Sequence, residues 1–292
     1  MSSSNLIPWL LTTYITLYGL LEIQGSTYEQ ERSVRSVEGF DSLSNSYPYM
    51  ASVRYAGRPI CGGTIISPNV ILTTAGCIPE NYFLDLFYVK VGDSDINHKG
   101  SWHQVAQVLQ HEGYTKSKIL EETNTYERLN DIALLKLEKP IEIDNRTTRR
   151  IELFKESDDV HDHNLGSLIG WGMYPTFVNS SISNSKSNET KTSKRVVILR
   201  YPAELKYLEL NIASMQNCSD FYPSANLTKQ FCTYTLGEVP CSGDIGSPLV
   251  VNGKQAGIVS WGSKKCHTNA NLGYFTEVAK FEKWINEKIK SL

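Results

Sequence analysis

Short apolar runs recur along the chain from Tyr47 onward. They are rich in β-branched and aromatic residues, as in "YPYMASVRY", "VILTTAG", "FYVKVG" and "IALLKL", and turn-forming stretches such as "SPN", "GDSD" and "GSK" separate them. Many short runs of this kind are typical of strands in an antiparallel barrel or sandwich. The pattern therefore predicts an all-β fold.

Two segments depart from this pattern. The stretch Pro175–Arg195 contains "NSSISNSKSNETKTSKR", which is too polar to bury much surface and predicts a mobile surface loop. Its basic run "KTSKR" is interpreted as part of that solvated loop. Near the C-terminus, apolar residues recur at helical spacing and predict an amphipathic helix packed on the body. Those residues are Val278, Phe281, Ile285 and Ile289.

The N-terminus carries an uncharged apolar stretch, Leu6–Leu21, and the first charge after it is Glu22. This resembles the apolar region of a secretory signal peptide, with cleavage near Gly25. An uncleaved membrane anchor is the alternative, which Pro8, the threonines and the short length disfavour. We expect a signal peptide over 1–25, a propeptide-like segment over 26–35 and one domain over 36–292.

The remaining composition is that of an ordinary globular protein. The 292 residues are 40% hydrophobic and carry a formal net charge of -2. A core can form, and no strong basic field indicates nucleic acid or an anionic membrane as a partner.

An even number of cysteines behind a secretory signal predicts disulfides. The six residues are Cys61, Cys77, Cys218, Cys232, Cys241 and Cys266. Spacing alone leaves about 15 pairings open. Zinc is the alternative, but no close Cys-x-x-Cys pair is present.

Asn-x-Ser/Thr sequons mark glycosylation candidates. They are Asn145, Asn179, Asn188, Asn217 and Asn226.

Three motifs occur in a fixed order: "CGGTIISPNVILTTAGC", "NDIALLKL" and "CSGDIGSPLV" followed by "GIVSWG". With "GWG" at Gly170–Gly172 and the C-terminal helix, they resemble the trypsin/chymotrypsin family of serine proteases over Ser36–Leu292. The resemblance implies two antiparallel β-barrels with the active site in the cleft between them. It also implies the disulfides Cys61–Cys77, Cys218–Cys232 and Cys241–Cys266.

The same resemblance shows where this chain departs from the family. The family's histidine would fall at Gly76 and its serine at Ile245, so that only Asp131 remains of the catalytic triad. Glycine has no side chain and isoleucine has no lone pair, so neither can serve as base or nucleophile. Backbone N–H groups of Gly243 and Ile245 are expected to resemble an oxyanion hole. We therefore predict that the chain is not an enzyme; the alternative is a residual or unconventional serine-type hydrolase that uses Ser247.

The resemblance further suggests a specificity pocket with Val239 at its floor, which, if open, would favour an apolar group. The alternative is that the pocket has drifted or filled in. The expected surroundings of this pocket are Ser260, Trp261, Gly262 and Gly273. The activation signal would be cleavage after Arg35, with the ammonium of Ser36 inserting beside Asp244.

No cofactor or metal is expected. The family's calcium loop would fall at Gly92–Gln104, where Lys99 and few carboxylates argue against calcium, and His98 and His103 are interpreted as surface residues. We predict a secreted, extracellular protein with a binding or regulatory role. Its expected partners are extracellular proteins such as active proteases or protease inhibitors, and a secreted structural glycoprotein is a further alternative. Nucleic acid, and a membrane after signal cleavage, are not expected partners.

Overall fold

The computed structural model describes residues 46–97, 99–120, 125–160, 165–181, 193–221, 223, 225–234, 240–262 and 272–292. The chain divides into two compact units, Met1–Ser36 and Val37–Leu292, and every described residue belongs to the second unit. The predicted signal peptide and propeptide-like segment lie outside the described residues, so that division of the chain stays a prediction.

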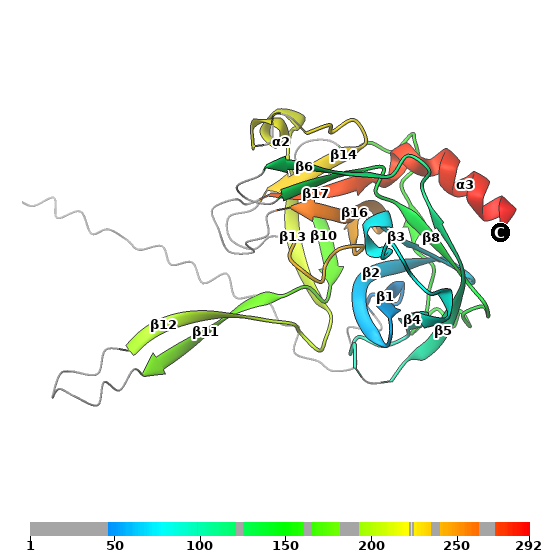
Figure 1. Ribbon diagram of the computed structural model, residues 1–292, viewed down its shortest axis with the longest axis horizontal. Helices are drawn as coiled ribbons and strands as arrows, with labels where there is room; N and C mark the ends of the chain where they lie inside the picture. Colours follow the sequence, from blue (N-terminus) through cyan, green and yellow to red (C-terminus); the bar gives the residue numbers. More distant parts are fainter. Residues whose placement is uncertain are drawn as a thin grey trace, which may run out of the picture. The chain divides into compact units, whose positions relative to one another are not determined.

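Six antiparallel strands close into the first barrel in the order β1-β2-β3-β8-β5-β4 (Figure 1). Their bounds are β1 Met50–Tyr55, β2 Arg58–Ser67, β3 Val70–Thr73, β4 Phe87–Val91, β5 Ser101–Gln110 and β8 Ala133–Leu137. Alternate residues of a strand face the same side, so one set fills the interior. Val53, Ile65, Ile71, Phe87 and Val89 are fully buried there.

The second barrel follows the order β15-β10-β13-β14-β17-β16, and pairing of β15 with β16 closes it. Its strands are β10 Leu165–Gly170, β13 Lys206–Ile212, β14 Gln230–Tyr234, β15 Pro248–Val251, β16 Lys254–Gly262 and β17 Leu272–Glu277. The short strand β9, Glu152–Leu153, adds to β16 in parallel. Leu168, Leu210, Leu249 and Phe275 fill the interior. The prediction of two antiparallel barrels is confirmed.

A shared apolar cluster joins the first barrel to the second and to the C-terminal helix. It combines Leu72 and Leu134 of the first barrel with Ile258 of β16 and with Phe281 and Ile285 near the C-terminus. Side chains from distant parts of the sequence therefore hold the two barrels and the C-terminal helix against one another.

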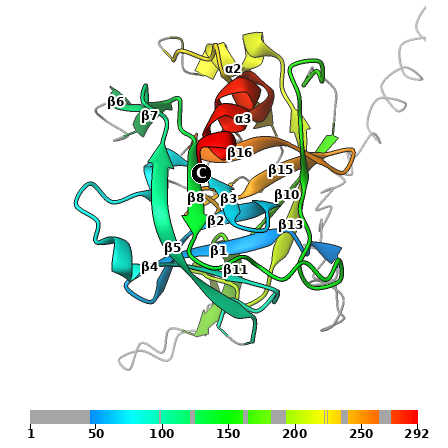
Figure 2. The same ribbon diagram turned by 90° about the vertical axis from the view of Figure 1, so that its right-hand side faces the viewer.

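The predicted C-terminal helix is confirmed, although its first turn is tighter than expected. A 3₁₀ turn over Val278–Phe281 leads into α3, Glu282–Ser291, which lies beside β8 (Figure 2). Lys136 of β8 donates from Nζ to the carbonyl oxygen of Leu292. The shorter helices are α2, Met215–Phe221, and the 3₁₀ turns η1, Ala75–Cys77, and η2, Leu84–Leu86.

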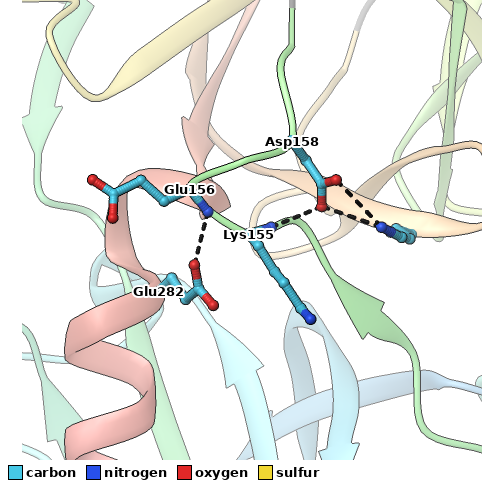
Figure 3. A network of polar contacts seen from close by, with 5 residues as sticks. Lys155, Glu156, Asp158 and Glu282 are labelled. Atoms are coloured by element: carbon cyan, nitrogen blue, oxygen red, sulfur yellow. Dashed lines mark hydrogen bonds and ion pairs between the residues drawn. The ribbon is translucent and has the colours of Figure 1, made fainter.

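The segment between the barrels is tied to both α3 and the β15–β16 hairpin (Figure 3). The backbone N–H of Glu156 donates to Glu282 Oε2 at 2.7 Å. Asp158 accepts from the backbone N–H of Lys155 at 2.9 Å and forms an ion pair with Lys254 Nζ at 3.2 Å. These contacts hold the crossover against the second barrel.

Two ribbons lie outside the barrels. β6, Thr115–Leu120, pairs with β7, Thr125–Leu129, and β11, Tyr174–Ser181, pairs with β12, Ser193–Arg200. The second ribbon projects from the barrels (Figure 1). The prediction of a surface loop over Pro175–Arg195 is therefore wrong at both ends, because "TFV" and "RVVIL" favour strand pairing. The middle of that stretch, 182–192, lies outside the described residues.

Two of the predicted disulfides are present, Cys61–Cys77 and Cys218–Cys232. Cys241 is also disulfide-bonded, and its predicted partner Cys266 lies outside the described residues. Among the residues described, no helix has the length and apolarity needed to cross a bilayer.

Glu112 fastens α3 to the first barrel, and its contacts depend on its charge. One carboxylate oxygen accepts from Trp284 Nε1 at 2.9 Å, and the other forms an ion pair with Lys288. Hydrogen bonding by Lys288 is the main cause that lowers the pKa of Glu112 to about 2. The stabilisation is therefore present above the ordinary carboxyl pKa and disappears as the pH falls through the folded value.

We expect Glu112→Gln to lower the free energy of unfolding at pH 7 by about 0.5–1 kcal/mol, the range of exposed ion pairs. The difference from the natural chain should shrink as the pH falls toward 2, where about half of the Glu112 side chains are protonated. Urea denaturation at several pH values measures it, and a difference at pH 2 as large as that at pH 7 would contradict the assigned charge contact.

Candidate active site

Asp131 is a completely buried carboxylate between the barrels. It lies just before β8, after Asn130, whose φ of 49° turns the chain. Asp131 Oδ1 accepts from the backbone N–H of Gly76 at 2.6 Å, and Oδ2 accepts from Ser260 Oγ at 2.6 Å. Burial raises the pKa of Asp131, while the hydrogen bonds from Ser260 and Gly76 and the charge of Arg128 oppose that rise.

Gly76 lies in η1, beside this carboxylate, and offers only its backbone. A Cβ built on Gly76 would lie 3.0 Å from both Cδ and Nε of Arg128 and 3.3 Å from Asp131 Oδ1. The space beside Asp131 in front of residue 76 is thus taken by an arginine side chain. A Cβ alone would require Arg128 to give by a few tenths of an ångström, and a longer side chain that points the same way would require it to move aside.

Arg128 is a site residue that the sequence analysis missed. It belongs to β7, and its Nη1 donates to the carbonyl oxygen of Ser260 on β16. Its own carbonyl oxygen accepts from Gln230 Nε2 at 2.6 Å, which holds β7 against the second barrel. The only sequence signal is its position three residues before Asp131 in "YERLNDIALL", and that spacing alone does not show where a side chain points.

Tyr114 is half-buried next to this charged pair. Burial is the main cause that raises its pKa to about 12, and the charge of Asp131 adds to the effect. Arg128 lowers the pKa of Tyr114 through its charge and a hydrogen bond. The phenol is therefore neutral near pH 7 and cannot act as a base there.

The turn that carries Ile245 lies against the segment that carries Gly76. A Cβ on Gly246 would lie 2.5 Å from Thr73 Oγ1 and 3.3 Å from Cys77 Sγ. Ile245 is half-buried and packs against the cores of both barrels. Its carbonyl oxygen accepts from the backbone N–H of Gly62 at 2.8 Å.

Two backbone N–H groups of this turn, those of Gly243 and Ile245, have no acceptor within the part of the chain that the structure describes. Gly243 has a φ of 100°, a conformation that favours glycine. Turns that leave successive N–H groups unpaired form concave sites for negatively charged oxygens. The chemistry available to the turn is therefore hydrogen-bond donation to an oxyanion or a carboxylate.

Ser247 is fully buried, and its Oγ has no hydrogen-bond partner among the described residues. A Cβ on Gly62 or on Gly170 would meet this oxygen, at 2.8 Å in the case of Gly170. The hydroxyl is therefore enclosed by two glycine backbones, and a substrate carbonyl cannot approach it without a rearrangement.

Asp244 is a second buried carboxylate. Oδ1 accepts from the backbone N–H of Gly172 and Oδ2 from that of Cys241, each at 2.9 Å. Burial raises the pKa of Asp244 to about 6, and the two hydrogen bonds oppose the rise. The predicted activation residues Arg35 and Ser36 lie outside the described residues.

The predicted pocket residues are only partly brought to the site. Ser260 contacts Asp131, whereas the side chain of Trp261 is buried, stacks on Tyr274 and donates to Gln230 Oε1 at 3.1 Å. Gly273 pairs with Gly262 across β16 and β17, and a Cβ on Gly273 would meet Pro240. Val239 lies outside the described residues.

The described part of the chain contains no group of three or more histidine, cysteine or acidic side chains arranged to hold a metal. His103 contacts Ser101 Oγ at 2.9 Å and the carbonyl oxygen of Lys139 at 3.3 Å, while His98 lies outside the described residues.

Of the sequons, Asn145, Asn217 and Asn226 are exposed, Asn179 lies in β11, and Asn188 lies outside the described residues.

Comparisons with known proteins agree along almost the whole chain. The family model described as Trypsin matches residues 36–285. Hypodermin-A of Hypoderma lineatum is 30% identical over 261 residues, covering 88% of this chain and 89% of that protein. Trypsin of Sarcophaga bullata is 28% identical over 285 residues, covering 96% of this chain and 99% of that protein.

Among solved structures, the chain is similar to neuropsin, described as a serine protease expressed in the limbic system of mouse brain. The TM-score is 0.66 at 25% identity, over 86% of this chain and 99% of that chain.

These comparisons overturn one prediction. The prediction that the chain is not an enzyme is wrong, because the matching relatives carry the names of proteases and the similarity points to an enzyme. The prediction rested on two residue positions, whereas the similarity spans the whole domain.

The pKa of Asp244 predicts how stability depends on pH. Because the folded value, about 6, lies above the ordinary value of 3.8, stability should fall as the pH rises from about 4 to 6. The loss should reach at most about 3 kcal/mol. Urea denaturation of Asp244→Asn should show a flatter pH profile over this window, and identical slopes for the variant and the natural chain would contradict the prediction.

Proposed function

Because this chain belongs to the trypsin family of serine proteases, we propose that it is a secreted member whose cleft mainly binds extracellular polypeptides and whose hydrolytic activity is residual. The observation that carries the proposal is the side chain of Arg128, which fills the space beside Asp131 in front of Gly76. The disulfides support an oxidising, extracellular setting.

The proposal assigns Gly76 to the position of the family's histidine and Ile245 to that of its serine. In that assignment, Asp131 keeps its place and its hydrogen bond to Ser260 but has no imidazole to orient. Proton transfer to a leaving group and attack on a carbonyl both need side chains that these positions lack. Hydrolysis, to which family membership points, then depends on substrate binding and the backbone donors of Gly243 and Ile245.

The expected rate follows from this assignment. Binding and an oxyanion hole without a working triad leave about 10³- to 10⁴-fold acceleration over water. Efficient members of the enzyme class reach kcat/KM values of about 10⁴–10⁸ M⁻¹s⁻¹. A role in binding active proteases or protease inhibitors is compatible with such a slow centre, because binding requires the shape of the cleft and not the nucleophile.

A serine-directed phosphonate probe and a binding assay test the proposal together. We expect no stoichiometric labelling of the chain cleaved after Arg35, weak peptide hydrolysis, and measurable binding to a protein inhibitor of trypsin on a sensor surface. Stoichiometric labelling of any serine, Ser247 included, would contradict the proposal. Absence of binding to polypeptides of any kind would contradict its binding part.

Restoring the missing side chains should require the removal of Arg128 as well. A histidine at position 76 would compete with the Arg128 side chain for the same space. We expect Gly76→His/Ile245→Ser/Arg128→Ala to exceed Gly76→His/Ile245→Ser in kcat/KM by about 10²-fold, the lower end of general-base catalysis. Peptides with an apolar group before the cleaved bond are suitable substrates.

The matched control is Gly76→His/Ile245→Ser/Arg150→Ala, which removes an exposed arginine. It should behave like the double variant. Equal activity of the double variant and the variant that lacks Arg128 would show that Arg128 does not obstruct position 76.

We further propose that cleavage after Arg35 frees the Ser36 ammonium to pair with Asp244. The carboxylate supports this, because burial raises its pKa and a nearby positive charge would lower the pKa again. Cleavage should therefore weaken the decrease in stability between about pH 4 and 6. Mass analysis of the secreted protein tests the cleavage, and an intact Arg35–Ser36 bond would contradict it.

A further inference from the structure

The surroundings of Asp131 combine a cation with two backbone donors that lack an acceptor among the described residues, and this combination has a definite ligand chemistry. Arg128 supplies the cation, and the N–H groups of Gly243 and Ile245 supply the donors. We propose that the cleft is a carboxylate-binding site, whose ligand is an extracellular polypeptide presenting either a free C-terminus or an acidic side chain. This inference rests on the proposed binding function and names the chemistry that the cleft recognises.

The cation and the turn that carries the donors are both anchored to β16. Val259 O accepts from the backbone N–H of Gly246 at 2.9 Å, and the carbonyl of the next residue, Ser260, accepts from Arg128 Nη1. The donor turn and the guanidinium are therefore anchored to adjacent peptide units of one strand. Arg128, Ile245 and Gly76 are all only partly buried, so the site faces the solvent.

The guanidinium keeps hydrogen-bonding capacity after its contacts within the protein are made. Arginine has five N–H donors. Nη1 binds Ser260 and Tyr114 contacts the group. Nε is buried without an acceptor among the described residues, so a ligand would have to use the terminal nitrogens Nη1 and Nη2. The negative charge of Asp131 interacts with Arg128, while the carboxylate oxygens of Asp131 accept hydrogen bonds from Gly76 and Ser260.

A carboxylate matches this arrangement better than a neutral carbonyl does. One carboxylate oxygen can accept from the two backbone N–H groups, while the other meets the positive charge. Arginine is suited to this role because it is weakly hydrated and always charged. Charge-assisted hydrogen bonds of this kind are about twice as strong as neutral ones.

Fluorescence anisotropy with three labelled probes tests the inference on the full secreted protein. The first probe is a hexapeptide of alanine and leucine with a free C-terminal carboxylate. The second is the same peptide as a C-terminal amide, and the third is the amide with one internal glutamate. We expect the amide to bind weakly and at least one carboxylate probe to bind about 10-fold more tightly. Comparison of the first and third probes identifies the source of the carboxylate.

Variants assign the preference to Arg128. Arg128→Gln should remove most of the difference between the acid and the amide, Arg128→Lys should retain part of it, and Arg150→Gln, at an exposed position, should leave it unchanged. Raising the salt concentration should weaken only the carboxylate probes.

Three failures can be distinguished. Equal affinity of the natural chain for all three probes would overturn the carboxylate site and leave polypeptide binding intact. An acid preference that survives Arg128→Gln would overturn the role of Arg128. If none of the probes bound, the inference would be contradicted, and the sensor assay with the protein inhibitor would decide separately on the proposed binding function. The comparison of acid and amide affinities uses the natural chain alone. The test therefore remains decisive even if a variant misfolds.

Discussion

The buried carboxylate of Asp131 is the constraint on which the arrangement of the two barrels depends. A carboxylate without solvent requires hydrogen-bond donors, and here they come from both sides: Gly76 from the first barrel and Ser260 from β16 of the second. Thr276 of β17 adds a hydrogen bond to the main-chain oxygen of Asp131 at 2.8 Å. Displacement of one barrel against the other would leave this group unsatisfied, so Asp131 has an architectural role whatever chemistry takes place beside it.

The similarity along the whole chain shows the family and the fold. The residues around Asp131 determine the chemistry that this fold can perform. Family membership is carried by the barrels, the disulfides and the order of the motifs, and a fold can keep these while a few atoms at its centre change. The comparisons correct the prediction that the chain is not an enzyme. The geometry around Arg128 concerns how fast, and through which groups, such an enzyme can act.

Strand periodicity was enough to predict an all-β fold, and helical spacing was enough to predict the C-terminal helix. The two barrels and the disulfide pairs came instead from the resemblance that the three motifs carry, and two of those pairs are present. Arg128 could not be found in this way, because its importance arises from a long-range contact between the β6–β7 ribbon and Ser260 of the second barrel. The β11–β12 ribbon was missed for a different reason: the polar composition of the stretch obscured short β-branched runs at its ends.

The close fit between Gly76 and Arg128 also restricts how this protein can change. A larger residue at 76 meets the arginine, whereas loss of the arginine alone leaves an empty space and removes a positive charge that lowers the pKa of Asp131. Replacement at either position therefore changes the surroundings of the other. The two positions are coupled, so the effects of substitutions at 76 and 128 on stability should not add.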